Sequence, residues 1–527
     1  MIRKMFVQRC LIYGVKNLRR QVSTKEIPTL TVPKKMARNI EKVKLRKIIQ
    51  EESLKQQRKG ALVISCKNKE YNFYSSGKFD ENDPKALASH GWKHRKSYIA
   101  RDFFTINAVS TNPALLRSTE QCGFADLDIS EELCRRLSTA GIEVPTDIQK
   151  QTIPAVLSGD NVLCAAQTGS GKTLAYLLPI IENLVRQKTH NPNETDNAPR
   201  AVILVPAKEL VHQLMEVCTL FEDLLVFRTL AGGQHISAKV TYMKSEPIDV
   251  FIATPGAFKK FLTYGRIKHS QLQHFVLDEA DTLLDDSFFH EVRSILTNML
   301  IHGGVGVQGQ GSTGVQLSLV SATMPRDLQK NIGSLISMES ITKITSRCLH
   351  SVLPHITQMF IRVKKSNKPA ELLKIVRKNA ESSVPTMVFC NQAATSYFVM
   401  KFLEENNIPS TIFNAQIRPQ FREGKFNDFQ TEKSDVIVCT DIASRGLDTI
   451  RARHIVNYDF PDFVSDYIHR CGRVGRIGSH GHGTVTSFIS ENWEVELLWQ
   501  IETAVRKRQP FHNVNANIKR KLRGVED

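Results

Sequence analysis

Short apolar runs alternate with longer stretches of helical periodicity in the part of the chain that begins near residue 124. In its first half these runs are Ala201–Val205, Val250–Ala253, Phe275–Asp278 and Leu317–Val320. Apolar runs separated by amphipathic helices of about 10–15 residues are typical of βαβ units, in which helices cover both faces of a parallel sheet. The pattern therefore predicts an α/β domain.

The alternation pauses around residues 346–354 and then resumes, which predicts a linker followed by a second α/β domain. The later apolar runs are Met387–Cys390, Thr411–Asn414, Val436–Thr440, His454–Tyr458 and Thr484–Ile489. The expected domains are therefore a first α/β domain at 116–346, a linker at 347–355, a second α/β domain at 356–505 and a basic tail at 506–527. Two low-complexity insertions in the first domain, 190–199 and 303–314, are expected to be surface loops.

The region before the first domain has a different pattern. Residues 36–59 are rich in Lys, Arg, Glu and Gln, which predicts a solvated or RNA-facing helix. Residues 60–115 show no regular alternation, and we expect them to be irregular and without a chemical role. Together, residues 26–115 are interpreted as a basic, partly disordered extension.

Charge is concentrated at the N-terminus. The chain has 527 residues and a net charge of +18, and its first hundred residues contain 24 Lys or Arg against 8 Asp or Glu. A polyanion such as RNA is one partner that this excess would attract. A solvated basic tail would have the same composition, so charge alone leaves both interpretations open.

The first 25 residues contain six Arg or Lys before position 21, and no Asp or Glu. Apolar residues are interleaved with these cations, as in the amphipathic, acid-free composition of a mitochondrial transit peptide. A nucleic-acid-binding arm is the alternative. A secretory signal would need a longer uninterrupted apolar core, which is missing.

The remaining composition narrows the class of protein. Hydrophobic residues make up 41% and charged residues 24% of the chain, which are ordinary globular values. No apolar run approaches the ~18 residues of a membrane span. The 10 cysteines form no C-x-x-C pair, so neither a zinc site nor a disulfide framework is indicated, as expected in a reducing compartment.

The stretch Ala165–Thr173, AAQTGSGKT, lies between an apolar run and a helical pattern. A Gly-rich loop between a strand and a helix lets backbone N–H groups and the helix N-terminus surround a polyphosphate. Lys172 would reach the β- and γ-phosphates of a nucleotide, and the Thr173 hydroxyl would contact Mg²⁺. The predicted ATP-binding residues of this loop are Ala166, Gln167, Thr168, Gly169, Ser170, Gly171, Lys172 and Thr173.

A second motif, the acidic sequence Asp278-Glu279-Ala280-Asp281, follows the apolar run Phe275–Leu277. At the end of a strand beside the phosphate loop, Asp278 could hold Mg²⁺. Glu279 could orient and deprotonate the attacking water. Both residues, with Lys172, are therefore candidate catalytic residues.

These two motifs resemble those of the DEAD-box ATP-dependent RNA helicases, and further family motifs follow in order over roughly residues 120–490. The resemblance implies two tandem RecA-like domains with parallel sheets, ATP and Mg²⁺ as cofactors, and RNA as partner. The string Gly141–Gln149 resembles the motif that reads adenine, and Phe124 stands where the family places a ring that stacks on the base. Gln149 offers one donor and one acceptor, which match the adenine edge.

The resemblance also assigns residues that couple and complete hydrolysis. Ser321, Thr323, Asp281 and His469 are the expected coupling set. In the second domain the strings Thr440–Asp448 and His469–Arg476 match two further motifs. They imply that Asp448 holds the ribose, and that Arg473 and Arg476 act as arginine fingers worth ~10³–10⁵ in rate.

The RNA-facing motifs are less regular. Pro-Ala-Lys-Glu-Leu, Thr-Pro-Gly-Ala and Asn-Ala stand where the family usually has Pro-Thr-Arg-Glu-Leu, Thr-Pro-Gly-Arg and His-Gly. The resulting loss of arginine side chains puts the RNA affinity in question but leaves the hydrolytic residues intact. The expected RNA-binding residues are Pro206, Lys208, Gly233, Thr254, Gly256, Asn391, Arg422 and Thr440.

Several strings, among them Asp278–Phe288, also resemble those of a mitochondrial member of the family. This resemblance implies work on mitochondrial ribosomal RNA and assembly of the large mitoribosomal subunit by a monomer. It implies a matrix location, with the nucleus as a second location. The expected activity is ATP-driven local unwinding or remodelling of RNA. An ATP-gated RNA clamp or assembly scaffold is the alternative, and a DNA-directed helicase is a weaker third interpretation.

Overall fold

The structure, a computed structural model, describes most of the chain after residue 59. The described residues are 60–80, 87–110, 122–190, 198–232, 247–263, 271–285, 288–304, 314–324, 328–444, 449–476, 479, 483–511 and 514. The expected transit segment, the helix at 36–59 and most of the two low-complexity insertions lie outside these residues.

The first domain is built on a seven-stranded sheet in which every strand pair is parallel. Its spatial order is β10-β4-β9-β8-β5-β7-β6. Along β4, Val162 and Cys164 face one apolar cluster and Leu163 faces another, so both sides of the sheet are buried. The strands are β4 (Asn161–Ala165), β5 (Ala201–Leu204), β6 (Phe227–Leu230), β7 (Val250–Ala253), β8 (His274–Asp278), β9 (Gln316–Ser321) and β10 (Ile341–Thr345).

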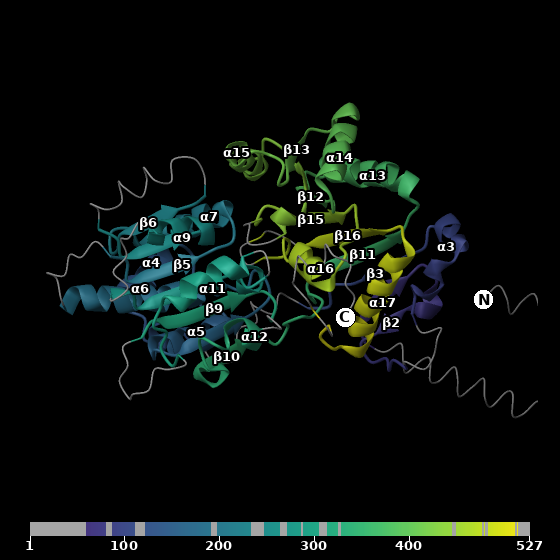
Figure 1. Ribbon diagram of the computed structural model, residues 1–527. Helices are drawn as coiled ribbons and strands as arrows, with labels where there is room; N and C mark the ends of the chain where they lie inside the picture. The colour runs from purple at the N-terminus through teal and green to yellow at the C-terminus, as the bar shows by residue number, and fades with distance from the viewer. Residues whose placement is uncertain are drawn as a thin grey trace, which may run out of the picture. The chain divides into compact units, whose positions relative to one another are not determined.

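Helices cover both faces of this sheet (Figure 1). The longest, α6 (Lys172–His190), starts at the predicted phosphate loop and buries an apolar side that includes Tyr176, Leu177 and Ile180. The other helices are α4 (Glu131–Thr139), α5 (Asp147–Leu157), α7 (Lys208–Cys218), α9 (Pro255–Thr263), α10 (Ala280–Leu283), α11 (Phe289–Thr297) and α12 (Leu328–Ile332).

The second domain has a nine-stranded sheet of order β13-β14-β12-β15-β16-β11-β3-β1-β2. The six strands from this half of the chain pair in parallel. They are β11 (Thr357–Arg362), β12 (Thr386–Phe389), β13 (Ser410–Phe413), β14 (Val436–Cys439), β15 (His454–Asn457) and β16 (Thr484–Ile489). The helices are α13 (Lys368–Glu381), α14 (Ala393–Glu405), α15 (Pro419–Gln430), α16 (Val464–Cys471) and α17 (Asn492–Lys507).

Three strands from the described residues 60–80 and 87–107 complete this second sheet, so the expectation that residues 60–115 are irregular is wrong for these strands. We call residues 60–80 and 87–107 the N-terminal module. It contains β1 (Leu62–Cys66), β2 (Phe73–Tyr74), the short helix α3 (Arg95–Ala100) and β3 (Phe103–Ile106). Strand β3 pairs antiparallel with β11, and β1 pairs antiparallel with both β3 and β2. The chain therefore begins the second sheet before it enters the first domain.

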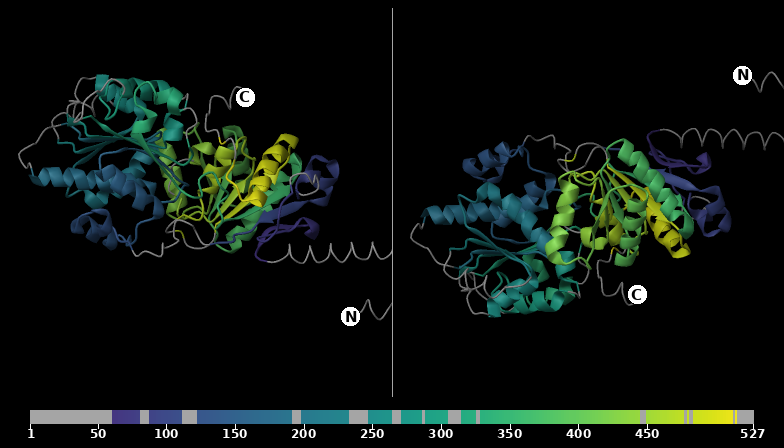
Figure 2. Two further views of the ribbon diagram at one scale, coloured as in Figure 1. Left: turned by 90° about the horizontal axis from the view of Figure 1, so that it is seen from below. Right: turned by 90° about the horizontal axis from the view of Figure 1, so that it is seen from above.

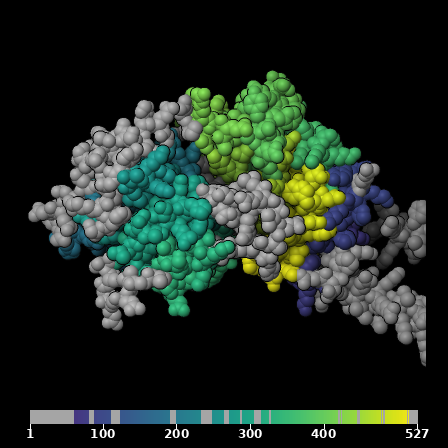
Figure 3. Space-filling model, viewed as in Figure 1, coloured from purple at the N-terminus to yellow at the C-terminus, as the bar shows by residue number. Residues whose placement is uncertain are grey.

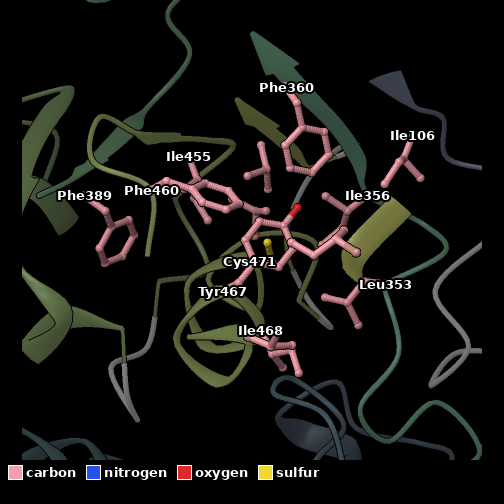
Figure 4. Packing of buried hydrophobic residues seen from close by; sticks show 14 of the residues in the cluster. Ile106, Leu353, Ile356, Phe360, Phe389, Ile455, Phe460, Tyr467, Ile468 and Cys471 are labelled. Carbon is pink, nitrogen blue, oxygen red and sulfur yellow. The ribbon is translucent and has the colours of Figure 1, made fainter. Parts of the chain in front are cut away.

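The N-terminal module shares the core of the second domain. Figure 4 shows Ile106, Leu353, Ile356 and Phe360 among the side chains of one buried apolar cluster. The ring of Phe104 stacks on Phe360 with centroids 4.9 Å apart. On the surface the module lies beside α17, as all views show (Figures 2 and 3).

A buried carboxylate joins the module to α17. Glu502 accepts hydrogen bonds from Ala88 N (2.7 Å), Ser89 N (3.1 Å) and Ser89 Oγ (2.6 Å), and it pairs with Arg506 at 2.7 Å. The indole Nε1 of Trp499 donates to Ser89 O at 3.1 Å. Because a buried carboxylate is stable only when its lone pairs are satisfied, these contacts fix the module in place.

The strands predicted from the apolar runs are confirmed to within one residue at each end. The runs missed β6, β10 and β11 as well as the N-terminal module. Among the described residues, no helix has the length and hydropathy needed to cross a membrane. The described cysteines are all free thiols.

Candidate functional site: a nucleotide site at the strand ends

The phosphate loop connects β4 to α6, as the sequence predicted. Gly169 and Gly171 have φ values of +76° and +87°, a conformation that glycine adopts without strain. The Lys172 ammonium donates hydrogen bonds to Ala166 O at 2.8 Å and Gln167 O at 3.2 Å. The loop therefore curls around its own lysine, whose ammonium contacts the backbone carbonyls of Ala166 and Gln167.

The acidic motif reaches the same place from β8. Burial lowers the pKa of Lys172, and the nearby charges of Glu279 and Asp278 oppose that shift. Burial also raises the pKa of Asp278 to about 6, with a further upward contribution from Glu279 and a downward one from Lys172. The structure thus brings Lys172, Asp278 and Glu279 together, with Glu279 buried and the other two half-buried.

Hydrogen bonds orient Asp278 from both sides. Its Oδ2 accepts from the Tyr176 hydroxyl at 2.9 Å, and its Oδ1 accepts from the Glu279 backbone N–H at 2.9 Å. Tyr176 belongs to the first turns of α6, so the helix that starts at the phosphate loop also holds the metal-binding candidate. Sequence reasoning missed this tyrosine because a buried ring on a helix has no motif of its own.

Glu279 is held in a strained conformation with an open acceptor. Its φ is +54°, which is uncommon for a residue other than glycine and costs on the order of 1–3 kcal/mol. Its Oε2 is buried, and no described protein group donates a hydrogen bond to it. A buried carboxylate oxygen without a protein donor is available to accept a proton from water.

The donor set fits a magnesium ion. Mg²⁺ prefers hard oxygen ligands and is commonly bound through one or two carboxylates together with substrate phosphates. Asp278 supplies a half-buried carboxylate whose pKa is raised by desolvation and, to a smaller extent, by the charge of Glu279. Thr173 follows Lys172 in the first turn of α6, so its hydroxyl could be a second ligand.

Gln149 is placed against the phosphate loop. Its Nε2 donates to Gly171 O at 3.0 Å, and its Oε1 accepts from Thr146 N at 2.9 Å as part of an N-terminal capping box of α5. Its amide therefore already ties α5 to the loop. Phe124 is buried in the core beside α5 and α6. Contacts of these two residues with adenine stay predictions.

The four expected coupling residues lie together. Thr323 donates from Oγ1 to Asp281 Oδ2 at 2.6 Å and from its backbone N–H to the same oxygen at 3.2 Å. The hydroxyl of Ser321 donates to Thr323 O. His469 Nε2 lies 3.5 Å from Asp281 Oδ2, and both side chains are fully buried.

The two candidate arginine fingers differ in their surroundings. Arg476 lies against the phosphate loop, where a Cβ added at Gly169 would be 3.1 Å from its Cγ. Arg473 is fully buried and donates from Nε to His469 O at 3.3 Å. Asp448, the candidate ribose ligand, lies outside the described residues.

Arg470 is a further buried arginine that sequence reasoning did not single out. It donates to both oxygens of Asp441 at 2.6 and 2.8 Å, to Asn391 Oδ1 at 2.7 Å and to Asp459 O at 2.7 Å. Charge pairing with Asp441 more than offsets desolvation and raises its pKa above the usual range. Arg470 therefore organises the strand ends of the second domain.

The candidate RNA-binding residues are at the ends of strands or in the first turns of the following helices. Pro206 follows β5 and Lys208 begins α7, while Thr254 lies between β7 and α9 and Gly256 lies in the first turn of α9. Thr440 follows β14, and Arg422 on α15 has its Nε 3.5 Å from Glu209 Oε1. Gly233 lies outside the described residues.

Asn391, the remaining candidate, is already engaged with protein groups. Its Nδ2 donates to Phe460 O and Asp462 Oδ1, and its Oδ1 accepts from Arg470. Its role in the described structure is thus to support the strand ends.

Comparison with known proteins defines the class. Residues 146–331 match the family model for the DEAD/DEAH box helicase domain, and residues 367–478 match the helicase conserved C-terminal domain. The chain belongs to the DEAD-box family of ATP-dependent RNA helicases. Human "Probable ATP-dependent RNA helicase DDX28" is 39% identical over 88% of this chain and 88% of its own, and the mouse protein of that name is 36% identical over 97% and 96%.

Solved structures confirm the fold. The structure of Mss116p bound to single-stranded RNA and AMP-PNP matches with a TM-score of 0.62 at 22% identity, over 74% of this chain and 78% of the other. The predicted pair of RecA-like domains with parallel sheets is therefore correct, and this protein is an RNA helicase enzyme that uses ATP.

Proposed function

We propose that this helicase remodels mitochondrial ribosomal RNA during assembly of the large mitoribosomal subunit, by closing its two domains on ATP and RNA. ATP and RNA would each favour the closed arrangement, so each would raise the affinity for the other. Closure would bend one RNA strand and unpair a short duplex, and release of phosphate would reopen the domains.

The observation that carries the chemical part of the proposal is the buried Glu279 oxygen beside Asp278 at the end of β8. Glu279 would accept a proton from the attacking water, and Lys172 would hold the β- and γ-phosphates. Bound Mg²⁺ would neutralise charge on the phosphate oxygens, with Asp278 and Thr173 as its protein ligands. Arg473 and Arg476 would stabilise the charge that develops on the transferring phosphate.

RNA would be gripped through sugar and phosphate by residues at the strand ends of both domains, so binding would depend little on base sequence. The candidates are Pro206, Lys208, Gly233, Thr254, Gly256, Asn391, Arg422 and Thr440. The basic region before residue 60 would add non-specific attraction to RNA.

The proposed location rests on residues 1–25, which have the composition of a mitochondrial transit peptide. A fluorescent protein fused to residues 1–25 should enter mitochondria. A matched fusion with the six Arg and Lys before position 21 changed to Gln should stay outside. Import of both fusions, or of neither, would contradict this assignment.

A duplex-release assay tests the activity against the alternative of an ATP-gated clamp. We expect release of a short RNA duplex with ATP to exceed release with a non-hydrolysable analogue. Equal release with both, or tight binding with no release, would favour the clamp. Crosslinking and sequencing of bound RNA in cells would then test the ribosomal target, and comparing ATPase stimulation by RNA and by DNA would test the nucleic-acid preference.

A further inference from the structure

The linker between the two sheets makes specific contacts with the motif at the end of β9. Met324, which directly follows Thr323, donates its backbone N–H to His350 Nε2 at 2.9 Å. His350 lies in the linker, five residues after the end of β10 and seven before the start of β11. The side chain of His350, which belongs to neither sheet, therefore accepts a hydrogen bond from the residue that follows the Ser321–Thr323 motif.

On its other side His350 is tied to the core of the second domain. Its carbonyl oxygen accepts a hydrogen bond from Phe511 N at 2.7 Å. Phe511 follows α17, and its buried ring packs in the same apolar cluster as Phe360 and Tyr467. Displacement of His350 would therefore pull on the second domain through a backbone hydrogen bond.

The conformation of His350 is constrained. Its φ is +56°, a left-handed value that a residue with a Cβ rarely adopts unless its surroundings hold it there. A backbone N–H can only donate, so the imidazole Nε2 must be the acceptor and the ring carries no proton on that atom. The hydrogen bond thus fixes the ring orientation and keeps Nε2 unprotonated.

These contacts continue into the acidic motif. Thr323 binds Asp281 through its hydroxyl and its backbone N–H, and the next backbone N–H binds His350. A short connected path therefore runs from the DEAD sequence through the end of β9 to the linker and on to Phe511. Such a path transmits a change of state only if its two ends are energetically coupled, and this coupling is what the experiments below measure.

We propose that His350 is a positioning residue that transmits the state of the Ser321–Thr323 motif to the second domain, so that hydrolysis leads to strand release. It contacts neither nucleotide nor RNA in this scheme. This inference rests on the proposed use of hydrolysis for strand release. It adds a linker side chain to the coupling residues expected from the family resemblance.

Two amide variants of the full chain provide the test. In His350→Gln the side-chain oxygen reaches about as far as Nε2 and can accept from Met324 N. In His350→Asn the amide is one methylene shorter and cannot reach, while Asn tolerates the left-handed backbone conformation. The measured quantity is the number of ATP molecules hydrolysed per duplex released, together with the KM for ATP at saturating RNA.

We expect His350→Asn to raise the ATP consumed per duplex released by at least about fivefold, the lower end of typical coupling effects, with the KM for ATP unchanged within twofold. His350→Gln should restore the ratio to within twofold of the unmodified protein. Equal ratios for both variants and the unmodified protein would overturn the proposal, as would equal losses in both.

A double variant separates a shared path from general destabilisation. If His350 acts through the motif, adding His350→Asn to Thr323→Val should worsen the ratio less than twofold beyond Thr323→Val alone. Full multiplication of the two effects would contradict the proposal. If the unmodified protein released no duplex with ATP, the proposed function would fail instead, whereas normal release by His350→Asn would sink only the role of His350.

Discussion

Thr323 and Asp281, 42 residues apart in the chain, are joined by a hydrogen bond of 2.6 Å between the threonine hydroxyl and the carboxylate. The bond links the end of β9 to the acidic motif that follows β8. Both side chains are buried, so neither can exchange its partner for water without cost. The acidic motif and the end of β9 are therefore expected to move as one unit.

Removing the Thr323 hydroxyl tests whether the acidic motif and the end of β9 act together. Thr323→Val keeps the shape of the side chain but leaves the Asp281 carboxylate with one donor fewer, which should cost about 1–3 kcal/mol of stability. We expect duplex release per ATP to fall more than nucleotide affinity does. Urea unfolding, nucleotide titration and duplex release measure the three quantities, and a selective loss of nucleotide affinity would contradict the coupling role.

The raised pKa of Asp278 predicts a pH dependence of magnesium-nucleotide binding. Mg²⁺ requires the ionised carboxylate, whereas burial raises the pKa of Asp278 to about 6, so that the protonated form predominates below about pH 6. Affinity for magnesium-ADP should therefore fall as the pH drops through about 6 and level off above it. Titrations between pH 5 and 8 check this, with Asp278→Asn as the control whose binding should be weak and lose the step near pH 6.

The stability of the folded protein depends on the ionisation of Asp278 in the opposite direction to magnesium-nucleotide binding. Because the pKa of Asp278 is higher in the folded protein than the ordinary value of 3.8, its contribution is most favourable below that value and is lost as the pH rises towards 6. Binding and folding thus make opposite demands on one carboxylate, which is common where function requires a buried charge.

His454 predicts a loss of stability in acid. It accepts from Asn379 Nδ2 at 2.7 Å and contacts Thr486 Oγ1 at 2.9 Å, and burial lowers its pKa from 6.5 to about 4. A lowered histidine pKa contributes stability that is complete above pH 6.5 and is lost as the pH falls towards 4. The free energy of unfolding should drop by about 2 kcal/mol from this group between pH 7 and 5.

Urea unfolding of the unmodified protein and of His454→Gln at both pH values isolates that contribution. The variant should show a smaller drop by about the same 2 kcal/mol, because its amide does not titrate. Equal drops for the two proteins would assign the acid sensitivity to other groups, of which buried His274 is one, its pKa being lowered by burial to about 4 as well.

The N-terminal module should depend on Glu502. Glu502→Gln keeps the volume but leaves Arg506 without its buried anionic partner, which should cost about 3 kcal/mol. Hydrogen exchange should become faster in residues 60–80 and 87–107 in particular. The matched control is Glu496→Gln, whose exposed pair with Lys93 should be worth about 0–1 kcal/mol. Unchanged exchange in the module would mean that Glu502 does not hold it.

Parallel strands were predictable where they are fully buried. Runs such as Val250–Ala253 and Val436–Cys439 are apolar at every position because helices cover both faces of their sheet. Strands β10 and β11 were missed because polar residues interrupt their apolar ones: in β10 Thr342, Lys343 and Thr345 are exposed, and in β11 the polar residues Gln358 and Arg362 are themselves buried. The local sequence pattern also does not reveal which strands such segments pair with.

The N-terminal module could not be predicted for a different reason. Its strands are short, and its partner β11 follows some 250 residues later. Trp92 is an isolated apolar residue and Phe104 lies in a run of only four residues, so only tertiary packing shows that they belong to the second core. Contacts of such long range are invisible to local periodicity.

The site was predictable where a motif carries its own chemistry. Lys172, Asp278 and Glu279 are brought together as the spacing of phosphate loop and acidic strand implied. Tyr176 donates a hydrogen bond to Asp278, Arg470 donates to Asp441, and His350 accepts from Met324. Residues of these types have too many structural uses to be recognised from the sequence alone.

The central claim is that Glu279 takes the proton from the water that attacks ATP. The direct measurement is single-turnover ATP hydrolysis by Glu279→Gln with saturating RNA, alongside its affinities for ATP and RNA. We expect both affinities to stay within about threefold of the unmodified protein and hydrolysis to slow by about 10²-fold or more. Hydrolysis at the unmodified rate would contradict the account.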